Sequence, residues 1–356
     1  MRTLDHFVGG RENNFNLLRF AAALLVLFSH SFALSTGNPN SEPLRDLIDM
    51  TPGSIAVDIF FVTSGFLVTG SLLSRGRVGR FLLDRVLRIY PALIVAVILT
   101  TVAVSLFFTS WSTARFASSP WTWEYVLRNA TLLFGVSYSL PGAFENVPLA
   151  TAVNGSLWTL PYEVRMYGLL ALLWGALHGF GALAQKYFGR AVILVAALAF
   201  MGHLALLGTE WNIAVGLLYM FFVGGAMRVL QHRLPMSWAG FWICLVALVA
   251  LVWVPSLFVV VYAVAVPYVV MFFAYVPAGG IRQFNRVGDY SYGMYIYSFP
   301  VQQATMAVLP GTGQVSLLLI SVGITFALAA VSWHLIEKRA LALKNSKWML
   351  AGRRQA

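Results

Sequence analysis

The sequence predicts an all-α integral membrane protein, and three observations support that prediction. Of the 356 residues, 59% are hydrophobic and 10% are charged, whereas soluble domains carry about 25% charged residues. Mean hydropathy is +0.76. The apolar runs are long and continuous rather than alternating, which excludes a β-barrel. So few charges also exclude disordered, collagen-like, coiled-coil and disulfide-rich secreted proteins.

About 20 mostly apolar residues cross the hydrocarbon core as a helix. About ten segments meet this requirement, and we predict spans at 15–35, 53–74, 84–109, 156–178, 190–207, 211–230, 237–253, 255–275, 290–309 and 314–337. Segment 124–140 is only partly apolar, so we interpret it as an interfacial or re-entrant helix. Pro255 separates two spans, either as a loop or as a kink. We expect one transmembrane domain over 1–356, with no appended soluble domain.

The basic residues predict the orientation of these spans. An even number of spans puts both termini on one side, and 19 of the 24 Lys and Arg residues then fall on that side. They are Arg2, Arg11, Arg75, Arg77, Arg80, Arg85, Arg88, Lys186, Arg190, Arg228, Arg233, Arg282, Arg286, Lys338, Arg339, Lys344, Lys347, Arg353 and Arg354. The positive-inside rule makes that side the cytoplasm. The net charge of +11 is therefore explained by topology beside anionic lipid, and we expect no nucleic-acid partner.

Ionisable residues inside spans are functional candidates, because charge at membrane depth is costly. Arg19 and His30 are eleven residues apart in the first span, so His30 lies about 16 Å further out on the same helix face. Asp58 and Glu163 come early in two spans that start outside, which brings all three to a similar depth. A carboxylate beside His30 would orient the imidazole, so we interpret His30, Asp58 and Glu163 as a general base with its orienting groups.

Each of these residues also has a plainer interpretation. His30 could be a packing residue hydrogen-bonded to backbone, and Arg19 a side chain that snorkels to the surface. Glu163 could pair with Arg165 and only brace the helices. We expect no metal site, because no His-rich spacing such as HExxH accompanies the three residues.

Arg85 and Arg88 lie three residues apart in the inner loop after the second span. On a helix their guanidinium groups point the same way and suit a phosphate. If only the number of basic residues in this loop is considered, Arg85 and Arg88 serve to set the orientation of the spans. The pattern R-x-x-R-x-Y-P, ending at Pro91, favours a site where a phosphorylated cytosolic donor arrives, with Arg19 beside the passage.

Four motifs occur in order along the chain: Leu18-Arg19-Phe20-Ala21 followed by His30, the segment 57–67 (VDIFFVTSGFL), Arg85-x-x-Arg88-x-Tyr90-Pro91, and the segment 156–167 (SLWTLPYEVRMY). Together they resemble the membrane-bound acyltransferase family 3, whose bacterial members O-acetylate cell-surface glycans. Segment 290–300 is a weaker match, with Ser298 where the family often has a histidine.

The resemblance implies an enzyme of the bacterial cytoplasmic (inner) membrane that uses acyl-CoA, expected to be acetyl-CoA, and no metal. The acceptor would be a hydroxyl of a glycan or lipid-linked glycan near the outer face. His30 corresponds to the family's essential histidine, and Arg85 and Arg88 to its coenzyme A-binding pair. Such a protein acts alone or with a separate periplasmic partner.

These inferences combine into one hypothesis, in which His30 deprotonates the acceptor hydroxyl and Asp58 or Glu163 holds the imidazole. Ser64 and Tyr167 are candidate oxyanion donors. Trp158 and Tyr167 are candidate substrate-binding residues, although aromatic side chains at such depth are more typical of interface anchors. An acyl-histidine intermediate, an acceptor that is a small hydrophobic molecule, and a transporter using His30, Asp58 and Glu163 as a proton relay are the alternatives.

Overall fold

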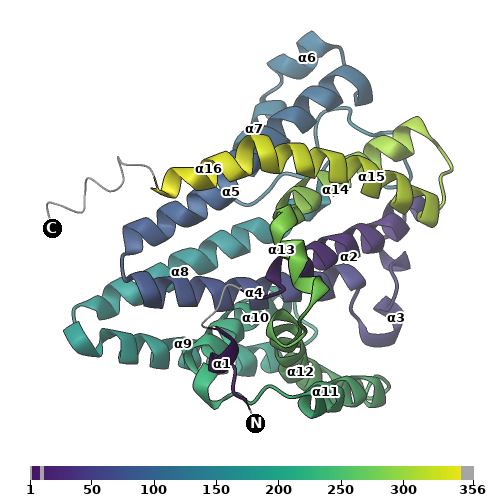
Figure 1. Ribbon diagram of the computed structural model, residues 1–356. Coiled ribbons are helices and arrows are strands. Elements are labelled where there is room, and N and C mark those ends of the chain that lie inside the picture. Colours follow the sequence, from purple (N-terminus) through teal and green to yellow (C-terminus); the bar gives the residue numbers. More distant parts are fainter. Residues whose placement is uncertain (1, 9–11, 346–356) are drawn as a thin grey trace, which may run out of the picture. The chain divides into compact units, whose positions relative to one another are not determined.

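The computed structural model describes residues 2–8 and 12–345, and within these ranges the regular structure is helical throughout (Figure 1). Arg11, Lys347, Arg353 and Arg354, four of the basic residues assigned to the cytoplasmic side, lie outside the described residues. The chain forms two compact units. The first comprises Met1–Val26, Pro43–Phe81 and Tyr162–Asp289; the second comprises Leu27–Glu42, Leu82–Pro161 and Tyr290–Ala356.

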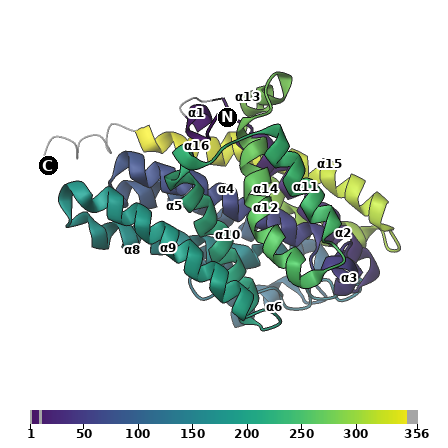
Figure 2. The ribbon, with the colours of Figure 1, turned by 90° about the horizontal axis from the view of Figure 1, so that it is seen from below.

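The first unit contains the beginning of α2 (Phe15–Thr36), most of α8 (Leu160–His178) and several whole helices. These are α1 (Asp5–Val8), α3 (Arg45–Ile48), α4 (Pro52–Arg75), α9 (Ala184–Ala205), α10 (Trp211–Val229), α11 (Trp238–Ala250), α12 (Pro255–Tyr275) and α13 (Phe284–Val287). Short 3₁₀ turns at Gly181–Leu183, Gln231–Arg233 and Gly280–Gln283 connect them. In this unit α10 packs against α4 and α9, and α11 lies beside α12 (Figure 2).

Local sequence determines where α4 begins and ends. Thr51 and Ser54 form a capping box, in which each side chain accepts from the other's backbone N–H, and Pro52 occupies the first helical position. Gly76 ends the helix with a φ of 65°, a left-handed conformation that glycine adopts without steric cost. The sequence after Thr51 therefore encodes a helix of 24 residues with defined ends.

Two glycines allow α4 and α10 to meet backbone to backbone. A Cβ atom on Gly224 would overlap the carbonyl oxygen of Val62, and one on Gly65 would overlap the carbonyl oxygen of Phe221. Small residues at a helix–helix contact permit this close approach, which strengthens van der Waals packing in a membrane. The contact fixes the position of α4, which carries Asp58 and Ser64.

Replacing Gly224 with valine is therefore expected to destabilise the protein by about 3 kcal/mol or more, because the side chain has backbone rather than movable atoms in its way. The measurement is the thermal midpoint in detergent. Gly175→Val on α8 is the matched control, since a Cβ there meets nothing within 4 Å. Equal midpoints for the two variants would contradict the close contact.

The second unit contains the end of α2, most of α5 (Val78–Ala103) and the helices α6 (Thr113–Ser118), α7 (Pro120–Thr131), α14 (Ser291–Val308), α15 (Gln314–Ser332) and α16 (Lys338–Ala342). Its shorter elements are η1 (Pro39–Ser41), η3 (Gly155–Thr159), η8 (Leu343–Asn345) and two π-helical segments, η2 (Val104–Phe108) and η7 (Trp333–Glu337). Helices α14 and α15 lie side by side, with Gly293 against Ala329 (Figure 1).

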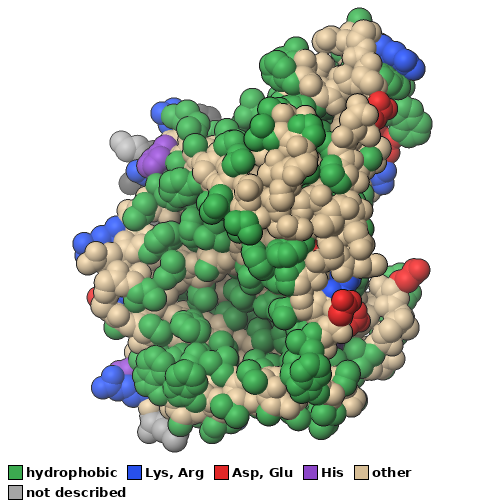
Figure 3. Space-filling view, turned by 90° about the vertical axis from the view of Figure 1, so that its right-hand side faces the viewer, with side chains coloured by type: hydrophobic (Ala, Val, Ile, Leu, Met, Phe, Trp, Pro, Cys, Tyr) green, Lys and Arg blue, Asp and Glu red, His purple; other side chains and the backbone are tan. Residues whose placement is uncertain are grey.

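Among the described residues, seven helical segments are long and apolar enough to cross a membrane. They are Phe15–Thr36, Pro52–Ser74, Val78–Phe108, Ala184–Ala205, Trp211–Val229, Pro255–Tyr275 and Gln314–Ala342. The protein is thus a multi-pass membrane protein. Large apolar side chains are exposed on these helices, including Leu198, Ile213 and Leu319, and hydrophobic side chains cover much of the face in Figure 3.

The other three predicted spans are helical but fall below the length or hydropathy of a spanning segment. Helix α11 has 13 residues, and α8 and α14 contain more polar residues. Ten spans with cytoplasmic termini therefore stay a prediction.

Two local predictions are refined by the structure. The helix expected over 124–140 was wrong beyond residue 131: α7 covers Pro120–Thr131, and Leu132 ends it in a left-handed conformation with a φ of 60°. Pro255 marks a loop rather than a kink, because it is the first residue of α12. Each outcome follows from the backbone geometry of a single residue: the left-handed conformation of Leu132 ends α7, and Pro255 suits only the first turn of α12.

Candidate active site

His30 lies on the part of α2 that belongs to the second unit. The ring is half-buried and meets Phe299 edge-on, with centroids 5.2 Å apart and planes at 77°. Among the described residues Nδ1 has no hydrogen-bond partner although it is buried.

The carboxylate that acts electrostatically on His30 is Glu42, which the sequence did not single out. Ser29 donates a hydrogen bond to this carboxylate from the residue just before His30. The chain returns to α2 through Gly37, whose φ of 72° makes the turn, and through η1. Glu42 is thus a negative charge held beside the histidine by short-range sequence.

The ring of Phe299 that contacts His30 sits in a site shaped by the η3 segment. A Cβ on Gly155 would approach the Phe299 ring to 2.7 Å, so glycine is required for the ring to fit. The Asn154 side chain donates to the carbonyl of Ile296 over 2.9 Å and joins this segment to α14. Ser298, at the position where the family often has histidine, is fully buried and donates to the carbonyl of Tyr295.

Asp58 lies in the first unit and has a defined partner there. Its carboxylate is 9% exposed and accepts a 2.7 Å hydrogen bond from the hydroxyl of Tyr262 on α12. A buried carboxylate needs such a donor, so this contact explains how Asp58 is tolerated within α4.

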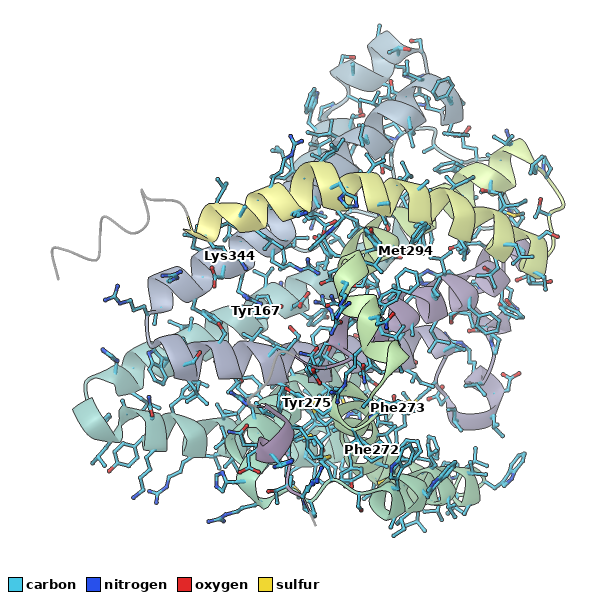
Figure 4. The ribbon with its side chains drawn as sticks, viewed as in Figure 1. Tyr167, Phe272, Phe273, Tyr275, Met294 and Lys344 are labelled. Atoms are coloured by element: carbon cyan, nitrogen blue, oxygen red, sulfur yellow. The ribbon has the colours of Figure 1, made fainter. Side chains whose placement is uncertain are left out.

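Glu163, Tyr167 and Ser64 form a second polar cluster in the first unit. Tyr167, one turn after Glu163 on α8, donates to the Glu163 carboxylate, and Ser64 of α4 donates to the same oxygen over 3.0 Å. The two hydroxyls also lie 2.8 Å apart. Figure 4 labels Tyr167 on α8. The sequence-predicted Glu163, Tyr167 and Ser64 are thus brought together, while Trp158 is half-buried in η3 of the second unit.

Arg88 is paired with a carboxylate that sequence reasoning missed. Its guanidinium lies 3.4 Å from Glu337, which is 2% exposed and also accepts a hydrogen bond from Ser332. The guanidinium lies over the ring of Tyr292, 5.7 Å from its centroid. Arg85 is half-buried one turn earlier on α5. Glu337 therefore fixes the position of Arg88, whose planar group offers five N–H donors in all.

Arg19 has its own acidic partner in the first unit. Its guanidinium lies 3.5 Å from Asp289 and 6.0 Å from the centroid of the Phe60 ring on α4. The ion pair places the charge of Arg19 at the end of the segment that leads into α14.

The predicted site residues are thus divided between the units. The second unit carries His30, Arg85, Arg88 and Trp158, and the first carries Asp58, Glu163, Tyr167 and Arg19. The pairing of His30 with Asp58 or Glu163 stays a prediction. Among the residues that the structure describes, no group of three His, Cys, Asp or Glu side chains could hold a metal ion.

Comparison with known proteins identifies the family. A family model described as an acyltransferase domain, family 3, matches residues 12–336. The chain belongs to this acyltransferase family. The acyltransferase is 31% identical over 359 residues to the "O-acetyl transferase" of Shigella phage Sf6, covering 96% of this chain and 99% of that relative. It is 30% identical over 367 residues to "Nodulation protein 10" of Rhizobium leguminosarum bv. viciae, covering 95% of each. No solved structure gave a significant match.

The family match confirms the resemblance carried by the four sequence motifs. It also favours acyl transfer over the transport hypothesis, because family and named relative are both transferases. The acyltransferase is therefore a membrane-embedded enzyme of the O-acyl transfer class.

Proposed function

We propose that the enzyme moves an acyl group, expected to be acetyl, from cytosolic acyl-CoA to a hydroxyl of a cell-surface glycan or glycolipid at the outer face of the bacterial inner membrane. The observation that carries this proposal is His30, an imidazole on a membrane-spanning helix, with the carboxylate of Glu42 acting on it and hydrogen-bonded to the adjacent Ser29. The relative named O-acetyl transferase supports acetyl as the group transferred.

In the proposed step, the imidazole of His30 accepts the proton of the acceptor hydroxyl as the hydroxyl oxygen attacks the thioester carbonyl. A carbon–oxygen bond forms, the carbon–sulfur bond breaks, and the electron pair leaves with sulfur as the coenzyme A thiolate. The imidazolium then returns its proton to the thiolate, so no co-reactant is consumed. A thiol with a pKa of about 8.5 is a good leaving group and needs little acid assistance.

The donor phosphates would bind at Arg85 and Arg88, which occupy the first turns of α5. With ten spans and cytoplasmic termini these turns face the cytosol, and Arg19 contributes a further positive charge beside the passage. The pantetheine arm would extend outward from there, so no free acyl group crosses the lipid.

The polar clusters of the first unit have separate roles in this scheme. Asp58 or Glu163 stays the proposed carboxylate that holds the imidazole of His30 and stabilises its cation. The hydroxyls of Ser64 and Tyr167 donate to one carboxylate oxygen of Glu163. As they stand they would accept from the acceptor hydroxyl, and they would bind a developing oxyanion only by releasing Glu163. Trp158 supplies an aromatic surface for a sugar.

The proposal is tested with purified protein in detergent, radiolabelled acetyl-CoA and surface glycans extracted from a strain that lacks the gene. Label is expected to appear in a glycan, and mass spectrometry of glycans from cells with and without the gene should show a difference of one acetyl group. Label found only in a small hydrophobic product, or none transferred, would contradict the glycan acceptor or the reaction itself.

Replacing Glu42 with glutamine is expected to lower kcat by about tenfold or more, because the imidazolium that forms during transfer loses its neighbouring negative charge. The readout is the initial rate of label transfer at saturating donor. Asp46→Asn, which removes an exposed carboxylate from the same outer loop, is the control and should leave kcat unchanged. Equal rates for the wild type and the Glu42 variant would remove Glu42 from the mechanism.

A further inference from the structure

Gln302 on α14 is anchored to the helical turn that precedes His30. Its side chain is fully buried, and Nε2 donates to the carbonyl of Leu27 over 3.0 Å and to the hydroxyl of Ser31 over 2.9 Å. Ser31 donates in turn to the carbonyl of Leu27 over 2.8 Å. The amide of Gln302 is therefore fixed against α2 at the residue next to His30.

The other end of the same amide has no partner. Oε1 of Gln302 is buried and accepts no hydrogen bond from the described residues. The orientation of the amide is determined by its neighbours, because the carbonyl of Leu27 can only accept and must face nitrogen. A buried acceptor without a partner is unfavourable, so such an atom needs an explanation.

The unpaired oxygen belongs to the same helix face that contacts the histidine. Gln302 follows Phe299 by three residues, and residues at this spacing lie on one face of a helix. Phe299 contacts the His30 ring, and Gln302 contacts the adjacent Ser31. The contact between α2 and α14 thus contains a buried acceptor beside the proposed general base.

We propose that the side-chain carbonyl of Gln302 accepts a hydrogen bond from the cysteamine amide N–H of the acyl-CoA donor, an inference that rests on the proposed function. An acetyl thioester has no hydrogen-bond donor of its own, and the acceptor hydroxyl gives its proton to His30. The cysteamine N–H is two carbons from sulfur and is the donor group nearest to the reacting carbonyl.

Gln303 provides a matched control within the same helix. It is also fully buried, its Nε2 donates to the carbonyls of Leu149 and Ala152 over 2.9 and 2.6 Å, and its Oε1 also has no partner among the described residues. One residue further along the helix is about 100° around its axis, so Gln303 faces the outer loop and not α2.

The test measures Kd for acetyl-CoA and for an analogue whose cysteamine N–H is replaced by CH₂, by calorimetry with the protein in detergent. The wild type is expected to bind the analogue about tenfold more weakly, the value of one hydrogen bond in a buried site. Gln302→Met should bind acetyl-CoA about tenfold more weakly and no longer distinguish the two ligands. Gln303→Met should behave as the wild type.

Other results would overturn the inference in identifiable ways. If Gln302→Met keeps the wild-type Kd but loses turnover, the amide acts on His30 itself or on the acceptor. If Gln302→Met does not fold, the wild-type comparison decides, and equal Kd values for the two ligands overturn the contact. Ser31→Ala is a second variant for this case, because it keeps the Gln302 carbonyl and the hydrogen bond from Gln302 to the carbonyl of Leu27. It should still bind acetyl-CoA more tightly than the analogue. A wild type that binds no acetyl-CoA contradicts the proposed function instead.

Discussion

Replacing His30 with alanine is expected to lower the rate of acyl transfer by about 10²–10⁴-fold, because general-base catalysis typically contributes that much. The half-buried ring contacts Phe299 but makes no hydrogen bond with the described residues, so its removal should leave folding and membrane insertion intact. The rate of label transfer from acetyl-CoA at saturating donor is the measurement. His30→Gln should be equally inactive, since an amide fills the space without a basic nitrogen.

His203→Ala is the control for this experiment. His203 is a half-buried histidine on α9, another membrane-spanning helix, and its Nδ1 also lacks a partner among the described residues. Both variants thus lose a half-buried histidine from a membrane-spanning helix. Only the His30 variant should lose acyl transfer. Full activity of His30→Ala would refute the assignment of the base.

The second large effect is expected at the pair formed by Arg85 and Arg88. Replacing Arg85 and Arg88 together with alanine should weaken acetyl-CoA binding by about 100-fold or more, because charge-assisted hydrogen bonds contribute about 1.5–3 kcal/mol each. The structure adds a requirement to the design: without Arg88, the buried carboxylate of Glu337 would lose its ion-pair partner, which is strongly destabilising. The triple variant with Glu337→Gln removes this charge and separates donor binding from folding.

Arg77→Ala with Arg80→Ala supplies the matched control, because these arginines have the same spacing in the same inner segment. Binding is measured as Kd for acetyl-CoA in detergent. If the two arginine pairs have equal effects, the loss reflects general positive charge rather than a phosphate site. An unchanged Kd in the triple variant would remove the phosphate assignment altogether.

Several predicted spans coincide with helices of the structure, whereas the helices that carry polar residues of the site fall short of the hydropathy of a spanning segment. Helices α2, α4, α10, α12 and α15 agree with their predicted spans closely. Helices α8 and α14 were also predicted, but Glu163 and Arg165 in one, and Gln302 and Gln303 in the other, make them less apolar. A hydropathy average cannot separate such helices from those outside a membrane.

The candidate site was predicted in part, and the omissions have specific causes. A search for ionisable residues inside spans finds His30, Asp58 and Glu163, yet it passes over Gln302 because glutamine carries no charge. Glu42 was missed since it lies in a polar loop, and only the turn at Gly37 brings it back to Ser29. Two adjacent glutamines within an apolar run were the signal available in the sequence.

Glu337 was hidden for a different reason. It directly precedes Lys338 and Arg339 near the end of a predicted span, where a carboxylate suggests only a neighbour for those bases. Its actual partner, Arg88, is about 250 residues away in the chain, and the π-helical turn at Trp333–Glu337 shifts the register of the helix there. Pairing over such a separation needs tertiary structure.

The glycine contact between α4 and α10 has a consequence for motion during turnover. With backbone directly against backbone, neither helix has side chains there that could change rotamer and let it slide, so the pair should behave as one rigid element. Because Ser64 lies on α4 and Tyr167 on α8, an opening between these two hydroxyls is then expected to move α8 against the rigid pair.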